Sequence, residues 1–567
     1  MNKIYALVWN PAQECWNVVS ENSSRRGKRS SKRRLAVALS LLGLVALEPA
    51  YALPTGQNIV AGQGAVSTNG QQMTINQQSD KLITQWDGFS VGANEGVKFN
   101  QPGSNSVALN RVVGVNGSDI QGKIDANGKV FLVNPNGVVF GKNAQVNVGG
   151  LVASTRDISN ADFLAGKNRF VGKSQAEVRT DGTLTAAQAG SVALLGARVS
   201  TQGVIQAQMG SIALGAGDDI TLNFDGNKLL NLQVDGAAVN ALVHNGGLLK
   251  AEGGQVLMTA NAASDVLQTV VNNQGTITAT TLSNQAGRIV LDGGNGGVVN
   301  VAGTLDASAA AGNGGVVETK GARVAVQPAA QVTTLAANGK TGSWKITAAE
   351  VNVADNGALN AATLAKGLAN NNVALTSTQS DMSVSGSVAW QSDNKLSLAS
   401  ERAGIKINAP LKATGTGAGL ELNHKTGYAL NNDAAVTLSG AKATFSANGE
   451  GYQVVQSLNQ LRAIENNMNG RYVLGTNITD ASRINAIGGD QTFTGVFDGL
   501  GNTVKGLSVT GKGPYVGLFN ASTGRISNLN LDSLTVTGND NSAFVGALAG
   551  LNSGEISNVK AKNIRVS

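Results

Sequence analysis

Short segments that alternate apolar and polar residues, each opened by a glycine, recur along the middle of the chain. A Gly-x-(Leu/Ile)-x-Ala pattern recurs at steps of 21, 44, 28 and 28 residues, and a Gly-x-(Val/Ile)-x-(Leu/Met) pattern follows 7 to 12 residues later. Alternation with a period of two predicts a short strand, and glycine permits a sharp corner before it. The first pattern occupies residues 182–186, 203–207, 247–251, 275–279 and 303–307, and the second occupies residues 190–194, 210–214, 254–258 and 287–291.

Repeated short strands of this kind predict a stacked architecture. One coil of two or three strands cannot bury its inward Leu, Ile and Val side chains, whereas stacked coils can. The repeat therefore predicts an all-β protein built as a parallel β-helix. An array of β-sandwiches is the main alternative, but it needs antiparallel hairpins with tight-turn signals, and few occur in this chain.

A basic and then apolar segment near the N-terminus has the form of a signal peptide. Seven lysines and arginines lie between Arg25 and Arg34, residues 35–47 are largely apolar, and Ala50-Tyr51-Ala52 places small residues around a cleavage site. An apolar run of about 13 residues is too short to span a bilayer. We therefore predict signal cleavage between Ala52 and Leu53.

The signal segment also changes the meaning of the net charge. The formal charge is +7, but eight of the 43 basic and three of the 36 acidic residues lie in residues 1–52, which leaves 35 and 33. A nearly neutral mature chain lacks the basic character typical of nucleic-acid-binding domains, so we expect no nucleic acid among its partners. The one cysteine, Cys15, is lost with the signal, so the mature protein has no disulfide.

Candidate catalytic and metal-binding residues are sparse. His244 and His424 are the only histidines and stand 180 residues apart, so no histidine cluster is available for a metal ion or for base catalysis. Polysaccharide lyases also use parallel β-helices, and the nearest approach to their acidic cluster is residues 218–219 and Asp225 with Lys228. We predict a protein that is not an enzyme, with no catalytic residue, no cofactor and no metal site.

Several ordered motifs identify the family that the chain resembles. Residues 1–24 resemble the extended signal-peptide region of very large autotransporters and two-partner-secretion exoproteins. Residues 53–310 carry, in order, Met73-Thr74-Ile75, Trp86-Asp87-Gly88-Phe89, Phe99-Asn100-Gln101-Pro102, Ala108-Leu109-Asn110-Arg111-Val112, the run from Val133 to Gly141, and Leu151-Val152-Ala153-Ser154-Thr155. This series resembles the N-terminal domain of the filamentous-haemagglutinin family, in the branch that includes the high-molecular-weight adhesins. The resemblance implies a right-handed β-helix that a dedicated outer-membrane transporter recognises.

The clearest turn signal inside these motifs is Asn134-Pro135-Asn136-Gly137. Proline at the second position, followed by asparagine and glycine, predicts a tight turn that closes one corner. The resemblance implies a further role, in which this turn folds early and helps the transporter to select its cargo. We predict that export requires Asn134, Pro135, Asn136 and Gly137 as an intact turn rather than as side chains that touch the transporter.

The pattern changes after residue 310. Degenerate strand-turn repeats continue to residue 450, and a short amphipathic helix is predicted over residues 455–468. After this helix a glycine-rich pattern recurs at a spacing of 29 to 30 residues and resembles the GLUG repeats of bacterial surface proteins. The predicted order is an extended signal region (1–24), a signal core (25–52), a secretion-type β-helix (53–310), further β-helical repeats (311–450) and a helix with GLUG-type repeats (451–567).

Together these features predict a secreted or cell-surface adhesin-type exoprotein that is exported by two-partner secretion. The expected partners are its cognate outer-membrane transporter and a receptor on host or bacterial cells. Two alternatives stay open at this point. One is a haemolysin or cytolysin of the same secretion class, and the other is the truncated stalk of a contact-dependent growth-inhibition toxin.

Overall fold

The computed structural model describes residues 5–10, 15–20, 52–224, 229–264 and 266–567. The chain divides into two compact units, Met1–Ala50 and Tyr51–Ser567. In the first unit, β1 (Tyr5–Asn10) and β2 (Cys15–Ser20) pair antiparallel. The predicted signal core lies outside the described residues, except for Ala52.

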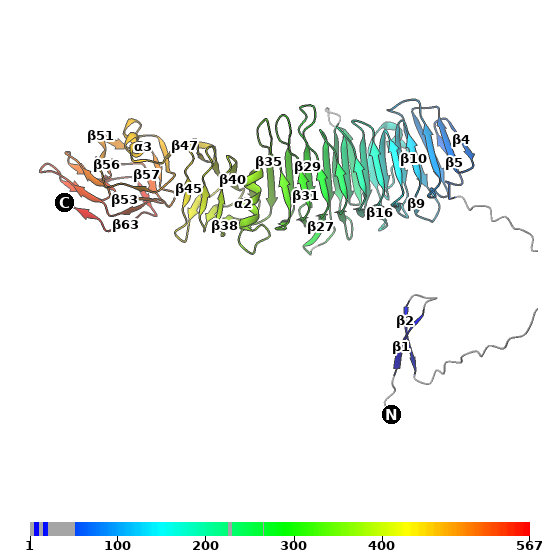
Figure 1. Ribbon diagram of the computed structural model, residues 1–567, viewed down its shortest axis with the longest axis horizontal. Helices are drawn as coiled ribbons and strands as arrows, with labels where there is room; N and C mark the ends of the chain where they lie inside the picture. Colours follow the sequence, from blue (N-terminus) through cyan, green and yellow to red (C-terminus); the bar gives the residue numbers. More distant parts are fainter. Residues whose placement is uncertain (1–4, 11–14, 21–51, 225–228, 265) are drawn as a thin grey trace, which may run out of the picture. The chain divides into compact units, whose positions relative to one another are not determined.

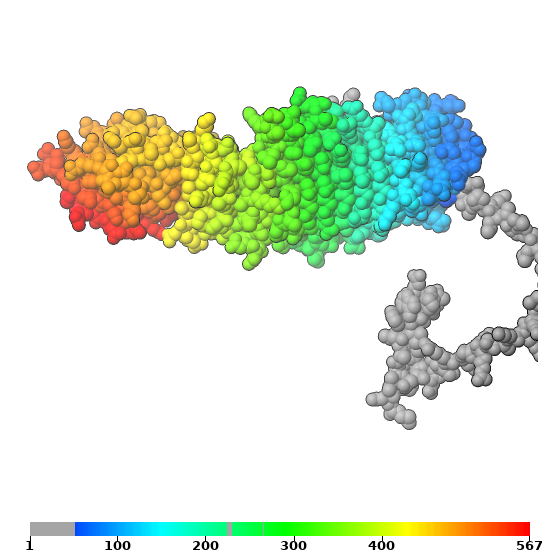
Figure 2. Space-filling view, in the orientation of Figure 1, coloured from blue at the N-terminus to red at the C-terminus, as the bar shows by residue number. Residues whose placement is uncertain are grey.

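The second unit is a parallel β-helix whose coils follow one another in sequence order (Figures 1 and 2). Its coils are stacked, and their strands form three parallel sheets along the β-helix, which we call faces 1, 2 and 3. The all-β, parallel β-helical fold predicted from the repeat is thereby confirmed. Within the part of the chain that the structure describes, no helix has the length and apolar character needed to cross a membrane.

Faces 1, 2 and 3 account for most of the strands between residues 58 and 447. At the N-terminal end, β3 (Asn58–Ala61) and β4 (Gly64–Asn69) pair antiparallel with the first strands of faces 1 and 2. Face 1 contains β6 (Lys81–Trp86), β8 (Val107–Val112), β11 (Lys129–Val133), β14 (Gly150–Ser154), β18 (Ser191–Gly196), β21 (Ser211–Ala216), β26 (Gln255–Ala260), β29 (Arg288–Asp292), β32 (Val316–Lys320), β35 (Ser343–Ala348), β37 (Asn372–Ser377), β40 (Lys395–Ser400), β43 (Gly419–Asn423) and β46 (Thr444–Ala447). Face 2 contains β5 (Gln72–Gln77), β7 (Gly96–Asn100), β10 (Lys123–Ala126), β13 (Gln145–Val148), β17 (Thr183–Ala186), β20 (Val204–Gln206), β25 (Leu248–Lys250), β28 (Thr276–Thr278), β31 (Thr304–Asp306) and β34 (Gln331–Thr333). Face 3 contains β9 (Ser118–Ile120), β12 (Val138–Phe140), β16 (Glu177–Thr180), β19 (Arg198–Thr201), β24 (Leu242–Asn245), β27 (Gln268–Asn273), β30 (Gly297–Val301) and β33 (Arg323–Val326).

The two glycine patterns of the sequence map onto two of these faces. The first pattern supplies β17, β20, β25, β28 and β31 of face 2, and the second supplies β18, β21, β26 and β29 of face 1. Equivalent apolar residues of the first pattern stack in the core between the faces. These are Leu184, Ile205, Leu249, Ile277 and Leu305, each 0% exposed.

The opening glycines are required by the close approach of successive coils. A Cβ atom on Gly203 would lie 2.0 Å from the carbonyl oxygen of Gly182, and a Cβ atom on Gly247 would lie 2.1 Å from that of Gly203. Neither Gly203 nor Gly247 has a positive φ. The reason for glycine is therefore the short distance between backbones, and not the left-handed corner that glycine also permits.

Face 1 continues past residue 310 without a break in hydrogen bonding, through β32, β35 and the later strands. A helix, α2 (Ala361–Asn370), packs on Trp344 within this part, and the Oδ1 atom of Asn360 caps it by accepting from the N–H of Thr363 at 2.7 Å. Two smaller sheets stand beside face 1. One contains β36 (Val351–Val353), β38 (Met382–Val384), β41 (Ile405–Ile407) and β44 (Tyr428–Leu430), and the other contains β39 (Val388–Trp390), β42 (Leu411–Ala413) and β45 (Val436–Leu438).

A tight antiparallel hairpin then reverses the chain. β46 pairs antiparallel with β47 (Glu450–Val455), and Asn448 and Gly449 between them have φ of 49° and 80°. The strands that stack on β47 are parallel to it, so they run opposite to face 1. They surround a second core, which we call the C-terminal stack. Its sheets contain β48 (Arg471–Leu474), β52 (Val496–Asp498), β57 (Arg525–Ser527) and β62 (Glu555–Ser557); β49 (Ile478–Thr479), β53 (Thr503–Lys505), β58 (Asn530–Asp532) and β63 (Lys560–Lys562); β50 (Arg483–Asn485), β54 (Ser508–Thr510), β59 (Thr535–Thr537) and β64 (Arg565–Val566); β51 (Ile487–Phe493), β56 (Phe519–Ser522) and β61 (Ala549–Asn552); and β55 (Tyr515–Val516) with β60 (Phe544–Val545).

The predicted helix of residues 455–468 is divided among shorter elements. Val455 belongs to β47, and Ser457 caps α3 (Leu458–Arg462) by accepting from the N–H of Gln460 at 3.2 Å. A 3-10 turn, η1 (Ala463–Asn466), follows. In the later coils Arg525 pairs with Glu555 and Asn530 with Lys560, which matches the repeat spacing seen in the sequence. The resemblance of these repeats to GLUG repeats stays a prediction.

Candidate functional site

Three of the motifs that carry the family resemblance meet at the same corner of the β-helix. Val133, the last residue of β11, pairs with Arg111 of β8 on one side and with Ser154 of β14 on the other. The predicted turn at residues 134–137 follows β11 directly and leads into β12. Residues that are far apart in the sequence are thus stacked at the C-terminal ends of three neighbouring strands of face 1.

Asn134 organises the turn from the inside. Its side chain is 0% exposed, and its Nδ2 atom donates to the carbonyl oxygen of Asn116 and to the Oγ atom of Ser118, both at 3.0 Å. Its Oδ1 atom accepts from the backbone N–H of Asn136 at 2.9 Å, and its carbonyl oxygen accepts from the N–H of Gly137 at 3.1 Å. The turn is therefore closed by both the backbone and the side chain of Asn134.

The other members of the turn have smaller roles. Pro135 and Asn136 are exposed, and the Nδ2 atom of Asn136 donates to the carbonyl oxygen of Gly114 at 2.8 Å. Gly137 has a φ of 113°, which favours glycine, whereas Asn136 does not have a positive φ. The Oγ atom of Ser174 donates to the carbonyl oxygen of Pro135, so the turn also contacts a neighbouring layer.

That neighbouring layer, which we call the appended layer, covers the outer surface of face 1. It consists of α1 (Asn160–Ala165) and an antiparallel sheet of β15 (Asn168–Val171), β22 (Asp219–Phe224) and β23 (Leu230–Gly236), together with residues 157–159, 172–174 and 217–218, which join these elements to the β-helix. Apolar side chains from both sides pack together there, apart from the main core. Examples are Leu109, Phe131 and Leu195 of face 1 with Phe163 and Phe170 of the appended layer.

Cationic side chains fasten the appended layer to the β-helix. Arg156 is 0% exposed, and its guanidinium donates to the carbonyl oxygens of Gly217 and Ser174, both at 2.7 Å, and to the Oδ1 atom of Asp218 at 3.0 Å. Burial lowers the pKa of Arg156, and the carboxylate of Asp218 opposes that effect. Arg111 reaches the same layer through the Oδ1 atom of Asp157, at 2.8 Å.

The residues predicted to flank the signal cleavage lie against the folded domain. Ala52 is exposed, and its N–H donates to the Oε1 atom of Glu95 at 2.9 Å. Leu53 is only 8% exposed and belongs to the main core. A peptidase could not reach a bond beside a buried leucine in the folded unit. Cleavage at this position would therefore have to precede folding.

Those candidate chemical residues that the structure describes do not assemble into a reactive cluster. Asp218 pairs with Arg156, and Asp219 pairs with Arg169, while Asp225 and Lys228 lie outside the described residues. The two ring nitrogens of His244 lie 3.3 Å and 3.2 Å from the side-chain amide nitrogens of Gln202 and Asn272. The Nδ1 atom of His424 accepts from the N–H of Gly427 at 3.0 Å. Burial lowers the pKa of both histidines.

Comparison with known proteins agrees with this geometry. Residues 50–301 match the TPS secretion domain, and residues 1–48 match the extended signal peptide of the type V secretion system. Two heme/hemopexin-binding proteins of Haemophilus influenzae are similar to the chain, one from strain ATCC 51907 / DSM 11121 / KW20 / Rd. They are 35% and 31% identical over 249 and 252 residues, which is 42% and 40% of this chain. The chain spans only 27% of the length of either relative.

A solved structure is similar over a larger part of the chain. The crystal structure of the HMW1 secretion domain from Haemophilus influenzae superposes with a TM-score of 0.51 at 27% sequence identity. The superposition covers 70% of this chain and all of that domain. The corner at residues 134–137 and the appended layer both lie inside the segment that matches the TPS secretion domain.

Proposed function

We propose that the chain is an adhesin-type exoprotein. It carries a TPS secretion domain behind an extended signal peptide. It is therefore exported through the outer membrane with the help of a cognate transporter. In this proposal the secreted β-helix binds a receptor on host or bacterial cells. Export and the need for a transporter follow from the matched domains. The adhesive activity is the proposed step.

The observation that carries the proposal is the continuation of the solenoid beyond the secretion domain. The match to that domain ends at residue 301, whereas face 1 continues in register from β29 to β46. The C-terminal stack then adds further coils. A solenoid places equivalent side chains of successive coils in rows, and such extended surfaces are suited to binding other macromolecules.

We also propose that the protein is not an enzyme. The acidic residues closest to a lyase-like cluster, Asp218 and Asp219, each form an ion pair with an arginine. Among the residues that the structure describes, no group of three or more His, Cys, Asp or Glu side chains could hold a metal ion. These features support binding rather than catalysis.

A second candidate function comes from the names of the curated relatives, which are heme/hemopexin-binding proteins. The similarity extends over about the length of the secretion domain, which serves export. His244 is a poor candidate for a heme ligand, because both of its ring nitrogens lie beside side-chain amides. We therefore rank heme binding below adhesion. Titration of residues 53–567 with hemin, followed by absorbance, distinguishes the two.

Adhesion is tested with bacteria that produce the transporter, with or without the exoprotein. We expect the exoprotein to increase the number of bacteria that adhere to epithelial cells or to one another. Purified residues 53–567 added in solution should compete and lower that number. Exported protein that gives no increase in adherence would contradict the proposal, and lysis of erythrocytes by the same bacteria would favour the cytolysin.

A further inference from the structure

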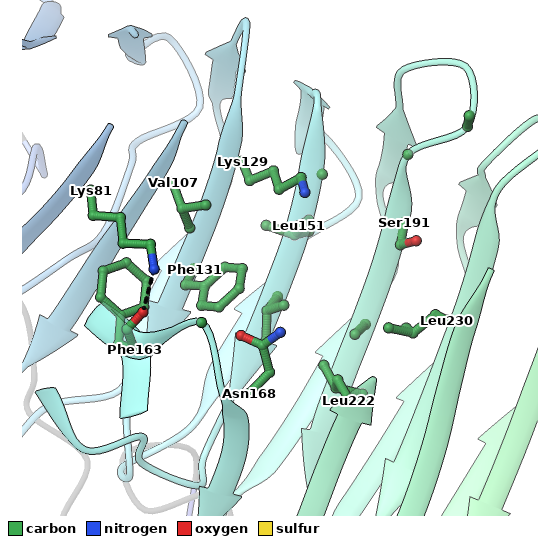
Figure 3. A pocket seen from close by; sticks show the side chains of 16 residues that line it. Lys81, Val107, Lys129, Phe131, Leu151, Phe163, Asn168, Ser191, Leu222 and Leu230 are labelled. Carbon is green, nitrogen blue, oxygen red and sulfur yellow. Dashed lines mark hydrogen bonds between the residues drawn. The ribbon is translucent and has the colours of Figure 1, made fainter. Parts of the chain in front are cut away.

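A cavity of about 250 Å³ lies between the outer surface of face 1 and the appended layer. Figure 3 shows Phe131 on its floor, with Phe163 of α1 on one side and Leu222 and Leu230 on the other. The lining is mainly apolar. Phe131, Phe163, Leu222 and Leu230 are each 2% to 7% exposed, so the walls are already fixed by packing around the space.

Among the described residues, the charged side chains that line this cavity are basic. Lys81 and Lys129 lie along one side of it (Figure 3), and none of the described lining residues is an aspartate or a glutamate. The Nζ atom of Lys81 donates to the carbonyl oxygens of Phe163 and Leu164, at 3.1 Å and 2.6 Å. Lys81 therefore closes the C-terminal end of α1 and, at the same time, brings a positive charge to the edge of an apolar space.

We propose that this cavity binds one unbranched apolar chain with an anionic head group, namely a free carboxylate of about eight to ten carbons. An apolar cavity of about 150 Å³ is sufficient for benzene, so the space here suits a somewhat larger apolar group. The ammonium group of Lys81 complements an anionic head and disfavours a cationic one.

The size of the cavity distinguishes this ligand from the two other apolar occupants that could enter it. A membrane phospholipid carries two long chains, and they exceed the volume available. An apolar side chain from a protein partner would fill only part of it and would need no anionic group. Dependence on both chain length and head-group charge is therefore specific to the proposed ligand.

The test uses calorimetric titration of purified residues 53–567 with hexanoate, octanoate and decanoate. Each CH₂ group that enters the cavity should tighten binding about fourfold, so each step of two carbons should tighten it about fifteenfold. Longer chains should give no further gain. Decyltrimethylammonium, which has the same chain with a cationic head, should bind at least tenfold more weakly than decanoate.

Matched variants locate the ligand. Ala193 lines the cavity, and its partner in the next coil, Ala213, packs in the same apolar cluster without lining the cavity. Ala193→Leu should fill the space and weaken decanoate binding at least tenfold, whereas Ala213→Leu should leave binding within about twofold of the parent. Lys81→Gln should weaken binding of decanoate but not of decanol, whereas a variant that only disturbed the packing of α1 would weaken both. Lys123→Gln on face 2 should change neither.

Two results would overturn the proposal. One is non-specific surfactant binding. It would show as decanoate binding that is equally tight in Ala193→Leu and the parent, or as decyltrimethylammonium binding that is as tight as decanoate binding. The other is no binding by any member of the series, because the cavity would then be a packing defect. The chain-length series on the parent protein needs no variant, so it decides the matter even if a variant fails to fold.

Discussion

The side chain of Asn134 is fully buried and forms hydrogen bonds with Asn116, Ser118 and Asn136. It is therefore the residue on which the corner after β11 depends most. We predict that Asn134→Ala lowers the free energy of unfolding by about 2–3 kcal/mol, because buried partners such as the carbonyl oxygen of Asn116 lose their hydrogen bonds. The matched variant Asn136→Ala loses one exposed hydrogen bond and should cost less than about 1 kcal/mol. Urea unfolding of residues 53–567 measures both, and equal effects would remove the special role of Asn134.

The buried carboxyl group of Asp498 should make the stability of the C-terminal stack depend on pH. It is 1% exposed and accepts hydrogen bonds from the hydroxyl of Tyr428 and from the N–H of Leu500. Burial raises the pKa of its carboxyl group, and these hydrogen bonds together with the charge of Arg525 oppose the rise only in part. A carboxyl whose pKa is higher in the folded state stabilises the fold below its unfolded pKa of about 3.9, and this contribution is lost as the pH rises through the folded value.

We therefore expect Asp498→Asn to become more stable relative to the parent as the pH is raised from about 4 towards neutrality. The measurement is the difference between the two urea midpoints of the C-terminal stack at each pH. A difference that stays constant across this range would show that Asp498 does not titrate there.

Among the elements, the glycines that open the strands of face 2 give a prediction about stability. A Cβ atom on Gly247 would lie 2.1 Å from the carbonyl oxygen of Gly203, whereas a Cβ atom on Gly296 would meet nothing within 4 Å. We predict that Gly247→Ala lowers the unfolding free energy by about 1–3 kcal/mol through steric overlap between coils. Gly296→Ala should change it by less than about 0.5 kcal/mol. Thermal unfolding compares the two variants, and similar stability would contradict the close-approach explanation.

The sequence predicted the regular part of these elements well. The alternating pattern at residues 203–207 or 247–251 specifies which side chain points inward. Because stacked coils need only such an inward apolar side chain in each strand, the strands and their order could be predicted. The reason for the glycines could not, because the distance between two coils is a property of the stack. The helix of residues 455–468 was predicted as one element, whereas the cap at Ser457 delays its start.

The appended layer was not foreseen from the sequence. β22 and β23 alternate apolar and polar residues as the strands of the solenoid do, so alternation alone does not distinguish them. The sequence signal that could have indicated their antiparallel pairing is the dipeptide Asp225-Gly226 between them, which is typical of hairpins. α1 has only six residues, which is too short for a helical period to stand out. The buried role of Arg156 was equally hidden, because a lone arginine after Ser154-Thr155 reads as an exposed residue. By contrast, the turn at residues 134–137 was predicted from its proline and glycine alone.

The whole molecule is exported through the outer membrane with the help of a cognate transporter, and we propose that it folds as a β-helix after signal cleavage. The burial of Leu53 and the absence of disulfides from the mature chain both suit a protein that crosses the membrane unfolded. Folding outside the cell is then driven by the stacking of coils, turn by turn.

The decisive measurement is the amount and N-terminal sequence of the protein in the culture fluid of cells with and without the transporter. We expect abundant protein that begins at Leu53 when the transporter is present, and protein confined to the cells when it is absent. Asn134→Ala should reduce the secreted amount while synthesis is unchanged. Equal amounts in the culture fluid with and without the transporter would contradict the account.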